Sequence, residues 1–284
     1  MADFWAAYQS TLGFAMVNAF FALSTYAALS AGMLSFATVT FAALGGFLGA
    51  QLAVHLALPP VLAMPVSALS GALLAYGVAL LFLRLDSHWM ALASLALVLI
   101  TRVVALNATA LTGGVNGLSV PLSLPLWVLA AILAVICVVF WRLSASWYGI
   151  AARAVREDAA VAATLGIPQR RIQTIAFIIS GAVGGLGGIL LALMLQFLSP
   201  ETYFIDIAFT MIAAVVLGGS YHWAGAIVGA VVFTALPVLL QAVVPDFEKV
   251  ANGICLLFIM IFLPRGLIDP RALRLRRTRK APSR

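Results

Sequence analysis

The chain has 284 residues, of which 64% are hydrophobic and only 9% are charged, and its mean hydropathy is +1.13. These values exclude a soluble globular protein, because the surface of such a protein needs far more Lys, Glu, Asp and Arg. The net charge of +7 does not indicate nucleic-acid binding, since the basic residues form a few patches beside apolar runs. The composition therefore predicts an integral membrane protein in contact with lipid.

Nine apolar segments follow one another along the chain, and each is long enough for a helix to cross most or all of a hydrocarbon core of about 30 Å. Their predicted bounds are 8–30, 33–57, 60–83, 88–108, 121–141, 172–197, 203–219, 223–244 and 250–264. We expect an all-α fold, a polytopic bundle of about nine transmembrane helices within a range of eight to ten. The first segment is expected to be retained as a span, because no basic region precedes it. Several glycines between 45 and 49 predict that the second segment breaks or packs closely against a neighbour.

Small polar residues are scattered through the early segments. A polar solute that crosses a membrane needs hydrogen-bond partners, so these residues are candidates for a translocation path. The candidates are Asn18, Ser24, Thr25, Ser35 and Thr38. Hydrogen bonds between neighbouring helices explain the same residues equally well. Both interpretations stay open at the level of sequence.

Basic residues gather in two patches that orient the chain, because loops rich in Lys and Arg stay in the cytoplasm. Four predicted segments separate the loop 142–171 from the basic tail 271–284. An even number of crossings returns the chain to the side that it left, so both patches are expected in the cytoplasm and the N-terminus outside. We assign residues 1–270 to a single transmembrane domain and 271–284 to a cytoplasmic tail.

The loop 142–171 contains an Ala-rich segment that we expect to form one helix. Arg153 and Glu157 lie four residues apart, which is the spacing of neighbours on one helix face, and the alanines at 159–163 leave a narrow face for close approach. Gly166 is expected to end this helix. The segment fits either a socket on a partner protein or an ordinary solvated helix at the membrane interface.

Short sequence blocks spread over most of the chain share the pattern of one family. They are Leu29–Gly32, Leu111–Leu118, Arg153–Ile167, Ala176–Gly188, Ser199–Glu201, Val215–Gly219, Gly225–Ala230 and Phe262–Leu267. Together they resemble the branched-chain amino-acid permease family of ABC importers. Block 153–167 is similar to the family's cytoplasmic coupling loop. The Thr-Gly-Gly pattern at 112–114 is similar to the outer loop of the second of the family's two paired permease subunits.

This resemblance implies a permease subunit of an ABC importer for branched-chain or related hydrophobic amino acids in a bacterial inner membrane. The implied partners are a second permease subunit that forms a heterodimer, two cytoplasmic ATP-binding subunits, an extracytoplasmic substrate-binding protein and membrane lipid. The helix in the loop would then be a coupling helix that receives movement from the ATP-binding subunits. The residues expected to couple it to them are Arg153, Arg156, Glu157, Ala160, Ala163 and Gly166.

The sequence lacks a phosphate-binding Gly-x-x-x-x-Gly-Lys-Ser/Thr loop, so ATP hydrolysis is expected in separate subunits. His55, His88 and His222 do not have the spacing of metal ligands, and we expect no metal, cofactor or catalytic residue. The alternative function is a secondary transporter driven by an ion gradient, which would place ionisable residues in the middle of spans. A membrane-embedded enzyme would instead need a cluster of polar residues at span ends.

Overall fold

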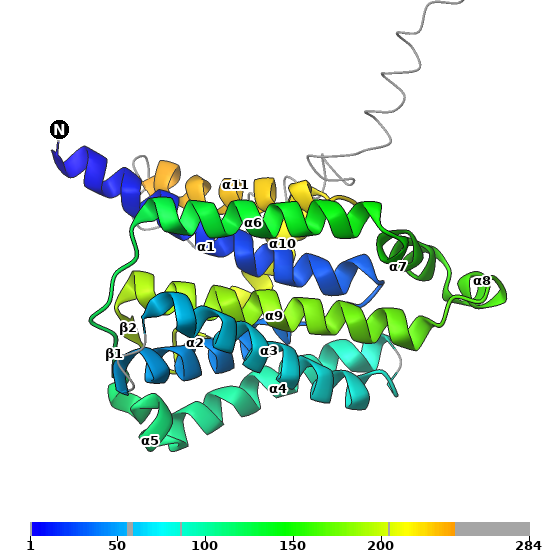
Figure 1. Ribbon diagram of the computed structural model, residues 1–284, viewed down its shortest axis with the longest axis horizontal. Coiled ribbons are helices and arrows are strands. Elements are labelled where there is room, and N and C mark those ends of the chain that lie inside the picture. The colour runs from blue at the N-terminus through cyan, green and yellow to red at the C-terminus, as the bar shows by residue number, and fades with distance from the viewer. Residues whose placement is uncertain (1, 56–58, 86, 204, 242–284) are drawn as a thin grey trace, which may run out of the picture.

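Figure 1 shows the computed structural model of the chain, in which residues 2–55, 59–85, 87–203 and 205–241 are described. The helices are α1 (Ala2–Ser30), α2 (Thr38–His55), α3 (Pro60–Phe82), α4 (Ser87–Asn107), α5 (Thr109–Thr112), α6 (Leu126–Ala145), α7 (Trp147–Glu157), α8 (Ala159–Thr164), α9 (Gln169–Leu195), α10 (Ile205–Gly218) and α11 (Trp223–Gln241). A 3-10 helix covers Gly114–Asn116, and strands β1 (Leu118–Ser119) and β2 (Phe197–Leu198) pair antiparallel. We call the end of the bundle with α7 and α8 the basic end, and the opposite end with β1 and β2 the strand end.

Six helices in the described part of the chain are long and apolar enough to cross a membrane. They are Gln9–Ser30 of α1, α2, α3, Trp89–Asn107 of α4, α6 and α9. Helices α10 and α11 form a pair that is bent by 119°, and the total is seven if this pair counts as one span. The fold is therefore a polytopic helical bundle, as the apolar segments predict.

The second predicted segment is a continuous helix from Thr38 to His55, although it contains Gly45, Gly46 and Gly49. Residues 33–37 precede it as a loop. The ninth predicted segment, 250–264, and the basic tail 271–284 lie outside the described residues.

Segments 203–219 and 223–244 were expected to be two separate spans, and the structure corrects this expectation. Helix α10 has only 14 residues, about 21 Å at 1.5 Å per residue, which is too short to cross a membrane by itself. It is joined to α11 through the bend at residues 219–222. Helix α11 then turns back toward the strand end, so the pair returns the chain to the end at which it began (Figure 1).

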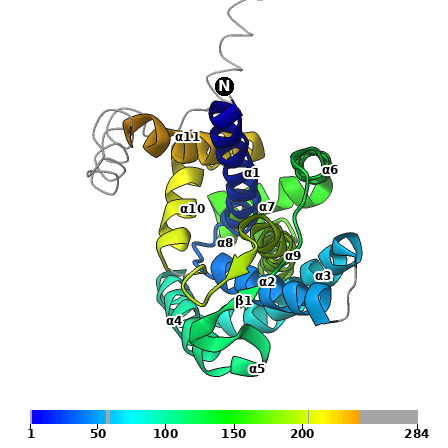
Figure 2. The same ribbon diagram turned by 90° about the vertical axis from the view of Figure 1, so that its left-hand side faces the viewer.

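Helix α9 lies in the middle of the bundle and packs against α1, α2 and α3 (Figure 2). Glycines make this packing close. A Cβ atom added to Gly45 of α2 would collide with the backbone of Gly185, and one added to Gly71 of α3 would collide with the carbonyl oxygen of Gly181. A Cβ on Gly185 would itself collide with the carbonyl oxygen of Ser67. The backbones of α2, α3 and α9 therefore touch directly, which is how membrane helices associate when lipid is as apolar as their side chains.

Helices α3, α4 and α6 carry large apolar side chains on their outer faces. Examples are Leu81, Leu92 and Trp127, whose side chains are mostly exposed. In a membrane protein such faces contact lipid, whereas α1, α2 and α9 are largely buried within the bundle.

The close contact of α9 with α3 predicts that Gly185→Leu destabilises the fold. A leucine there has no space, because overpacking a tight core costs about 1–3 kcal/mol or more. The matched control is Gly77→Leu, since Gly77 lies on the exposed side of α3 and a Cβ there meets nothing within 4 Å. Size-exclusion chromatography after heating in detergent should show a lower melting temperature for Gly185→Leu than for Gly77→Leu. Equal melting temperatures would contradict the packing described.

Candidate functional site

The predicted coupling helix is two helices in the structure, α7 and α8, separated at Asp158. The expectation of one continuous helix is wrong because Asp158 adopts an extended backbone (φ −155°, ψ 108°) and caps α8. Its carboxylate accepts hydrogen bonds from the backbone N–H groups of Ala160 at 2.9 Å and Val161 at 3.0 Å. An Asp at this position satisfies N–H groups that would otherwise lack partners at the start of a helix. Gly166, with φ +77°, follows the end of α8 as predicted.

Helix α7 is amphipathic and is fixed to the bundle by one face. Ala151, Ala152 and Val155 are buried and belong to a core cluster with residues of α1, α3 and α9. Gly32, just after α1, packs against the α7 backbone, because a Cβ there would lie 3.2 Å from Cα of Arg156. A displacement of α7 must therefore also shift the bundle helices that pack against it.

The predicted coupling residues fall into two groups. Exposed residues form the outer surface of α7 and α8, which we call the docking surface; they are Arg153, Glu157, Ala160, Ala163 and Gly166. Arg156 is half-buried, and its guanidinium lies against the connection between α10 and α11.

Arg156 binds this connection with both ends of its guanidinium. Nη2 donates to Oγ of Ser220 at 2.7 Å, and Nη1 donates to the carbonyl oxygen of the same residue. The guanidinium carbon also lies 4.5 Å from the centre of the Tyr221 ring, within the range of a cation–π interaction. A helix near the basic end and the bend of the α10–α11 pair are thus held together by one side chain.

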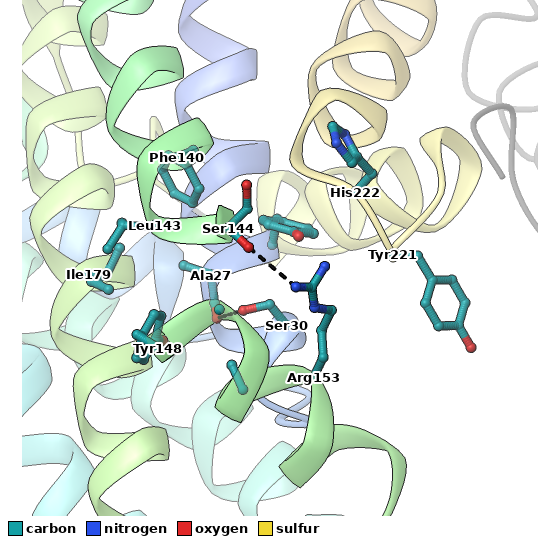
Figure 3. Close-up of a pocket in the computed structure, with 13 residues that line it drawn as sticks. Ala27, Ser30, Phe140, Leu143, Ser144, Tyr148, Arg153, Ile179, Tyr221 and His222 are labelled. Carbon is teal, nitrogen blue, oxygen red and sulfur yellow. Dashed lines mark hydrogen bonds between the residues drawn. The ribbon is translucent and has the colours of Figure 1, made fainter. Parts of the chain in front are cut away.

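Arg153 lies at the rim of a cavity of about 90 Å³ beneath α7 (Figure 3). Its Nη2 donates to the carbonyl oxygen of Ser144 at 3.3 Å. The cavity is also lined by Tyr26 and Ser30 of α1, by Tyr148 of α7 and by His222. Burial, and secondarily the charge of Arg153, lowers the pKa of His222, which favours the neutral imidazole at pH 7. Burial likewise raises the pKa of the Tyr148 hydroxyl, so this group stays protonated.

Three of the five predicted path residues are buried and take part in two separate hydrogen-bonded contacts between helices. Ser24 Oγ donates to the carbonyl oxygen of Ser180 at 2.6 Å, which joins α1 to α9. Thr25 Oγ1 lies 3.0 Å from the carbonyl oxygen of Phe21 and 3.3 Å from Oγ1 of Thr38, which joins α1 to α2. The bonds from Ser24 to Ser180 and from Thr25 to Thr38 are hydrogen bonds between helices, which the sequence analysis gave as the alternative to a translocation path.

The other two path residues are also engaged within the chain. Asn18 Nδ2 donates to Oγ1 of Thr234 at 2.9 Å and joins α1 to α11. Ser35 is buried, and its Oγ accepts the backbone N–H of Ala37 at 3.2 Å, just before α2 begins. The structure therefore gives all five residues a hydrogen-bonding partner, and their part in a path stays a prediction.

At the strand end, the Thr-Gly-Gly block forms a compact turn. Gly113 has φ +73°, and a Cβ there would collide with the carbonyl oxygen of Gly117. The hydroxyl of Thr112 accepts the backbone N–H of Gly114 at 3.1 Å. These glycines are thus required by backbone geometry. Beside this turn, Arg102 of α4 forms an ion pair with Glu201.

A profile described as "Branched-chain amino acid transport system / permease component" matches residues 8–263. The chain belongs to this family. It is therefore a multi-pass membrane protein of a family of transport permeases, which is not a family of enzymes. No solved structure matches the chain.

The relatives of this chain include proteins named LivM and LivH. The "High-affinity branched-chain amino acid transport system permease protein LivM" of Salmonella typhimurium (strain LT2) is 31% identical over 279 residues, which cover 84% of this chain and 62% of LivM. LivM of Escherichia coli (strain K12) is 29% identical over 247 residues, or 72% of this chain and 56% of LivM. LivH of Salmonella typhimurium is 26% identical over 144 residues, or 50% of this chain and 46% of LivH. The permease thus spans 56% to 62% of the length of these LivM relatives.

Ser220 and Tyr221 are site residues that sequence reasoning misses. They follow the block Val215–Gly219 but carry no motif of their own. The available signal was the double glycine at 218–219, which marks a break before them. The contact of Ser220 with Arg156 spans 64 positions in the sequence and is visible only in the folded structure.

The Asp158 cap predicts that Asp158→Ala loosens α8. Loss of such a cap costs about 1 kcal/mol, so the amides of Ala160 and Val161 should exchange hydrogen roughly fivefold faster. Asp158→Asn is the matched control because its side-chain oxygen still accepts a hydrogen bond. Hydrogen–deuterium exchange of the purified permease measures both variants. The cap has no such role if these two amides exchange at the same rate in Asp158→Ala and in Asp158→Asn.

Proposed function

We propose that this permease forms the membrane-spanning path of an ABC importer for branched-chain or related hydrophobic amino acids. The observation that carries this proposal is the docking surface on α7 and α8 at the basic end. Helix α7 is fixed to the bundle by its buried face, and α8 extends beyond the membrane helices (Figure 1). A rigid segment of this kind can receive movement from one protein and pass it to another, because the two conformations differ in their contacts.

The partners that we propose are a second permease subunit, two cytoplasmic ATP-binding subunits and an extracytoplasmic substrate-binding protein. The relatives in support are LivM and LivH, each named as a permease protein of a high-affinity branched-chain amino acid transport system. Since the chain is similar to both, a heterodimer of two related permeases is the arrangement that we favour. Ser24, Thr25, Ser35, Thr38 and Asn18 remain proposed path residues, and their present bonds would exchange for bonds to solute as helices separate.

We further propose that the basic end faces the cytoplasm of a bacterial inner membrane. All described arginines except Arg102 lie at that end, on or beside α3, α6, α7 and α9. Such an excess of basic residues is typical of cytoplasmic loops. The strand end, with the Thr-Gly-Gly turn and Glu201, then faces outward, toward the substrate-binding protein.

The docking surface predicts that Ala160→Trp uncouples the importer. An indole on this narrow face should obstruct a fitted partner, and we expect at least roughly tenfold less bound ATP-binding subunit and ATP-driven uptake, since tenfold corresponds to about 1.4 kcal/mol. The matched control is Ala145→Trp, which places the same side chain at the exposed end of α6. Copurification of the ATP-binding subunits and leucine uptake into proteoliposomes measure both variants.

Two outcomes would contradict this proposal. One is that Ala160→Trp and Ala145→Trp behave like the unaltered permease in both measurements. The other is that the permease alone moves leucine in proteoliposomes when an ion gradient is imposed. The second result would favour the secondary transporter.

The proposed orientation in the membrane predicts that cysteines at the strand end and at the basic end react differently with a thiol reagent. Val115→Cys at the strand end should react with a membrane-impermeant maleimide in intact cells, whereas Thr164→Cys at the end of α8 should react only after permeabilisation. Cys137 and Cys255 are replaced by alanine in both variants so that each carries one thiol. Labelling of Thr164→Cys in intact cells would reverse the proposed orientation.

A further inference from the structure

The side chain of Arg156 points away from the docking surface. Its neighbours on α7, Arg153 and Glu157, are exposed, whereas Arg156 is half-buried and binds Ser220 through two N–H groups. The planar fork of an arginine is suited to this arrangement, because it presents two donors in a fixed geometry and also stacks on the Tyr221 ring. A lysine would retain the charge but would lose the paired donors. The contact is therefore specific to the arginine side chain.

The segment that Arg156 grips lies at the bend of a stiff helix pair. A Cβ on Gly218 would collide with the carbonyl oxygen of Gly225, and one on Gly229 would collide with that of Ala214. Helices α10 and α11 are thus in direct backbone contact near the bend. Gly219, with φ +107°, makes the turn between them. A pull on Ser220 therefore moves both helices together, since neither can slide without losing this packing.

This helix pair packs against α1, which itself packs against the central helix α9. Helix α11 packs along α1, and Asn18 of α1 donates a hydrogen bond to Thr234 of α11 at 2.9 Å. Asn18 is one of the proposed path residues. A continuous chain of contacts thus runs from α7 through Arg156 and the bend to a polar pair between membrane helices.

We propose that Arg156 is a positioning residue that transmits displacement of α7 to the α10–α11 pair. This inference rests on the proposed function, in which α7 and α8 receive movement from ATP-binding subunits. Arg156 acts from beneath the docking surface and does not itself hold the ATP-binding subunit. Its loss separates ATP hydrolysis from transport while leaving the complex assembled.

The test uses the complete importer, reconstituted in proteoliposomes with its ATP-binding and substrate-binding subunits. In Arg156→Ala we expect normal copurification of the ATP-binding subunits and basal ATP hydrolysis within about twofold of normal. The number of leucine molecules moved per ATP should fall about tenfold, within the range of allosteric coupling. Arg156→Lys should recover part of this ratio, because its ammonium keeps the charge and can still donate to Ser220, although without the paired fork of arginine.

Three further variants separate transmission from a structural role. Ser220→Ala removes one of the two hydrogen bonds and should lower the ratio less than Arg156→Ala. The double variant Arg156→Ala/Ser220→Ala should be no worse than Arg156→Ala, since both changes break the same contact. Arg142→Ala is the control, since Arg142 is an exposed arginine near the end of α6 and outside the docking surface, and its ratio of transport to hydrolysis should stay normal. If Arg156→Ala does not accumulate, Arg156→Lys and Ser220→Ala decide the question.

The inference is overturned if Arg156→Ala keeps a normal ratio, or if it loses the ATP-binding subunits in parallel with uptake. Additive effects in the double variant would also overturn it. The docking proposal is judged separately by Ala160→Trp. If that variant assembles and transports normally, the docking surface is wrong; if it fails while Arg156→Ala transports normally, only the role of Arg156 is wrong.

Discussion

Direct backbone contact between α9 and its neighbours is the constraint on which the rest of the fold depends. Because Gly45, Gly71 and Gly185 lack side chains, α2 and α3 approach α9 closely enough for backbone atoms to touch. Lipid offers no hydrophobic advantage for burying one apolar helix against another, so close packing and hydrogen bonds must hold the bundle together. The bond from Ser24 of α1 to Ser180 adds a polar tie between α9 and another neighbouring helix. The other described helices are arranged around this centre (Figure 2).

At the basic end, α7 connects the outer surface of the molecule to this tightly packed bundle. Helix α7 shares its buried face with helices that pack around α9, while α8 extends outward. Arg156 adds a second connection, from α7 to a helix pair whose two members cannot move separately. In the proposed importer, a displacement of the outer surface would thus reach the bundle through two connections. One is the apolar face of α7, and the other is the side chain of Arg156. The first is spread over many contacts, whereas the second depends on one residue.

Hydropathy was sufficient to predict the long apolar helices of the described residues, because a long apolar run in a membrane has few alternatives to a helix. It could not reveal the bend between α10 and α11, since two adjoining apolar runs look alike whether they cross separately or fold back together. Gly166 was predicted correctly because helix termination there is a local property. Asp158 was missed because its effect depends on a side chain competing for backbone N–H groups, which an average over the alanines conceals. The bond from Arg156 to Ser220 has no local signal.

The cap at Asp158 divides the loop into two parts with different evolutionary freedom. The buried face of residues 147–157 must fit the bundle, so changes on that face are tested against the chain's own interior. Residues 159–166 are mostly exposed, although Ala162 is buried, so changes on their outer face would be tested mainly against the proposed ATP-binding subunit. Exchange of this short outer part between related importers would therefore change which ATP-binding subunits the proposed importer binds, while the membrane-spanning helices stay the same.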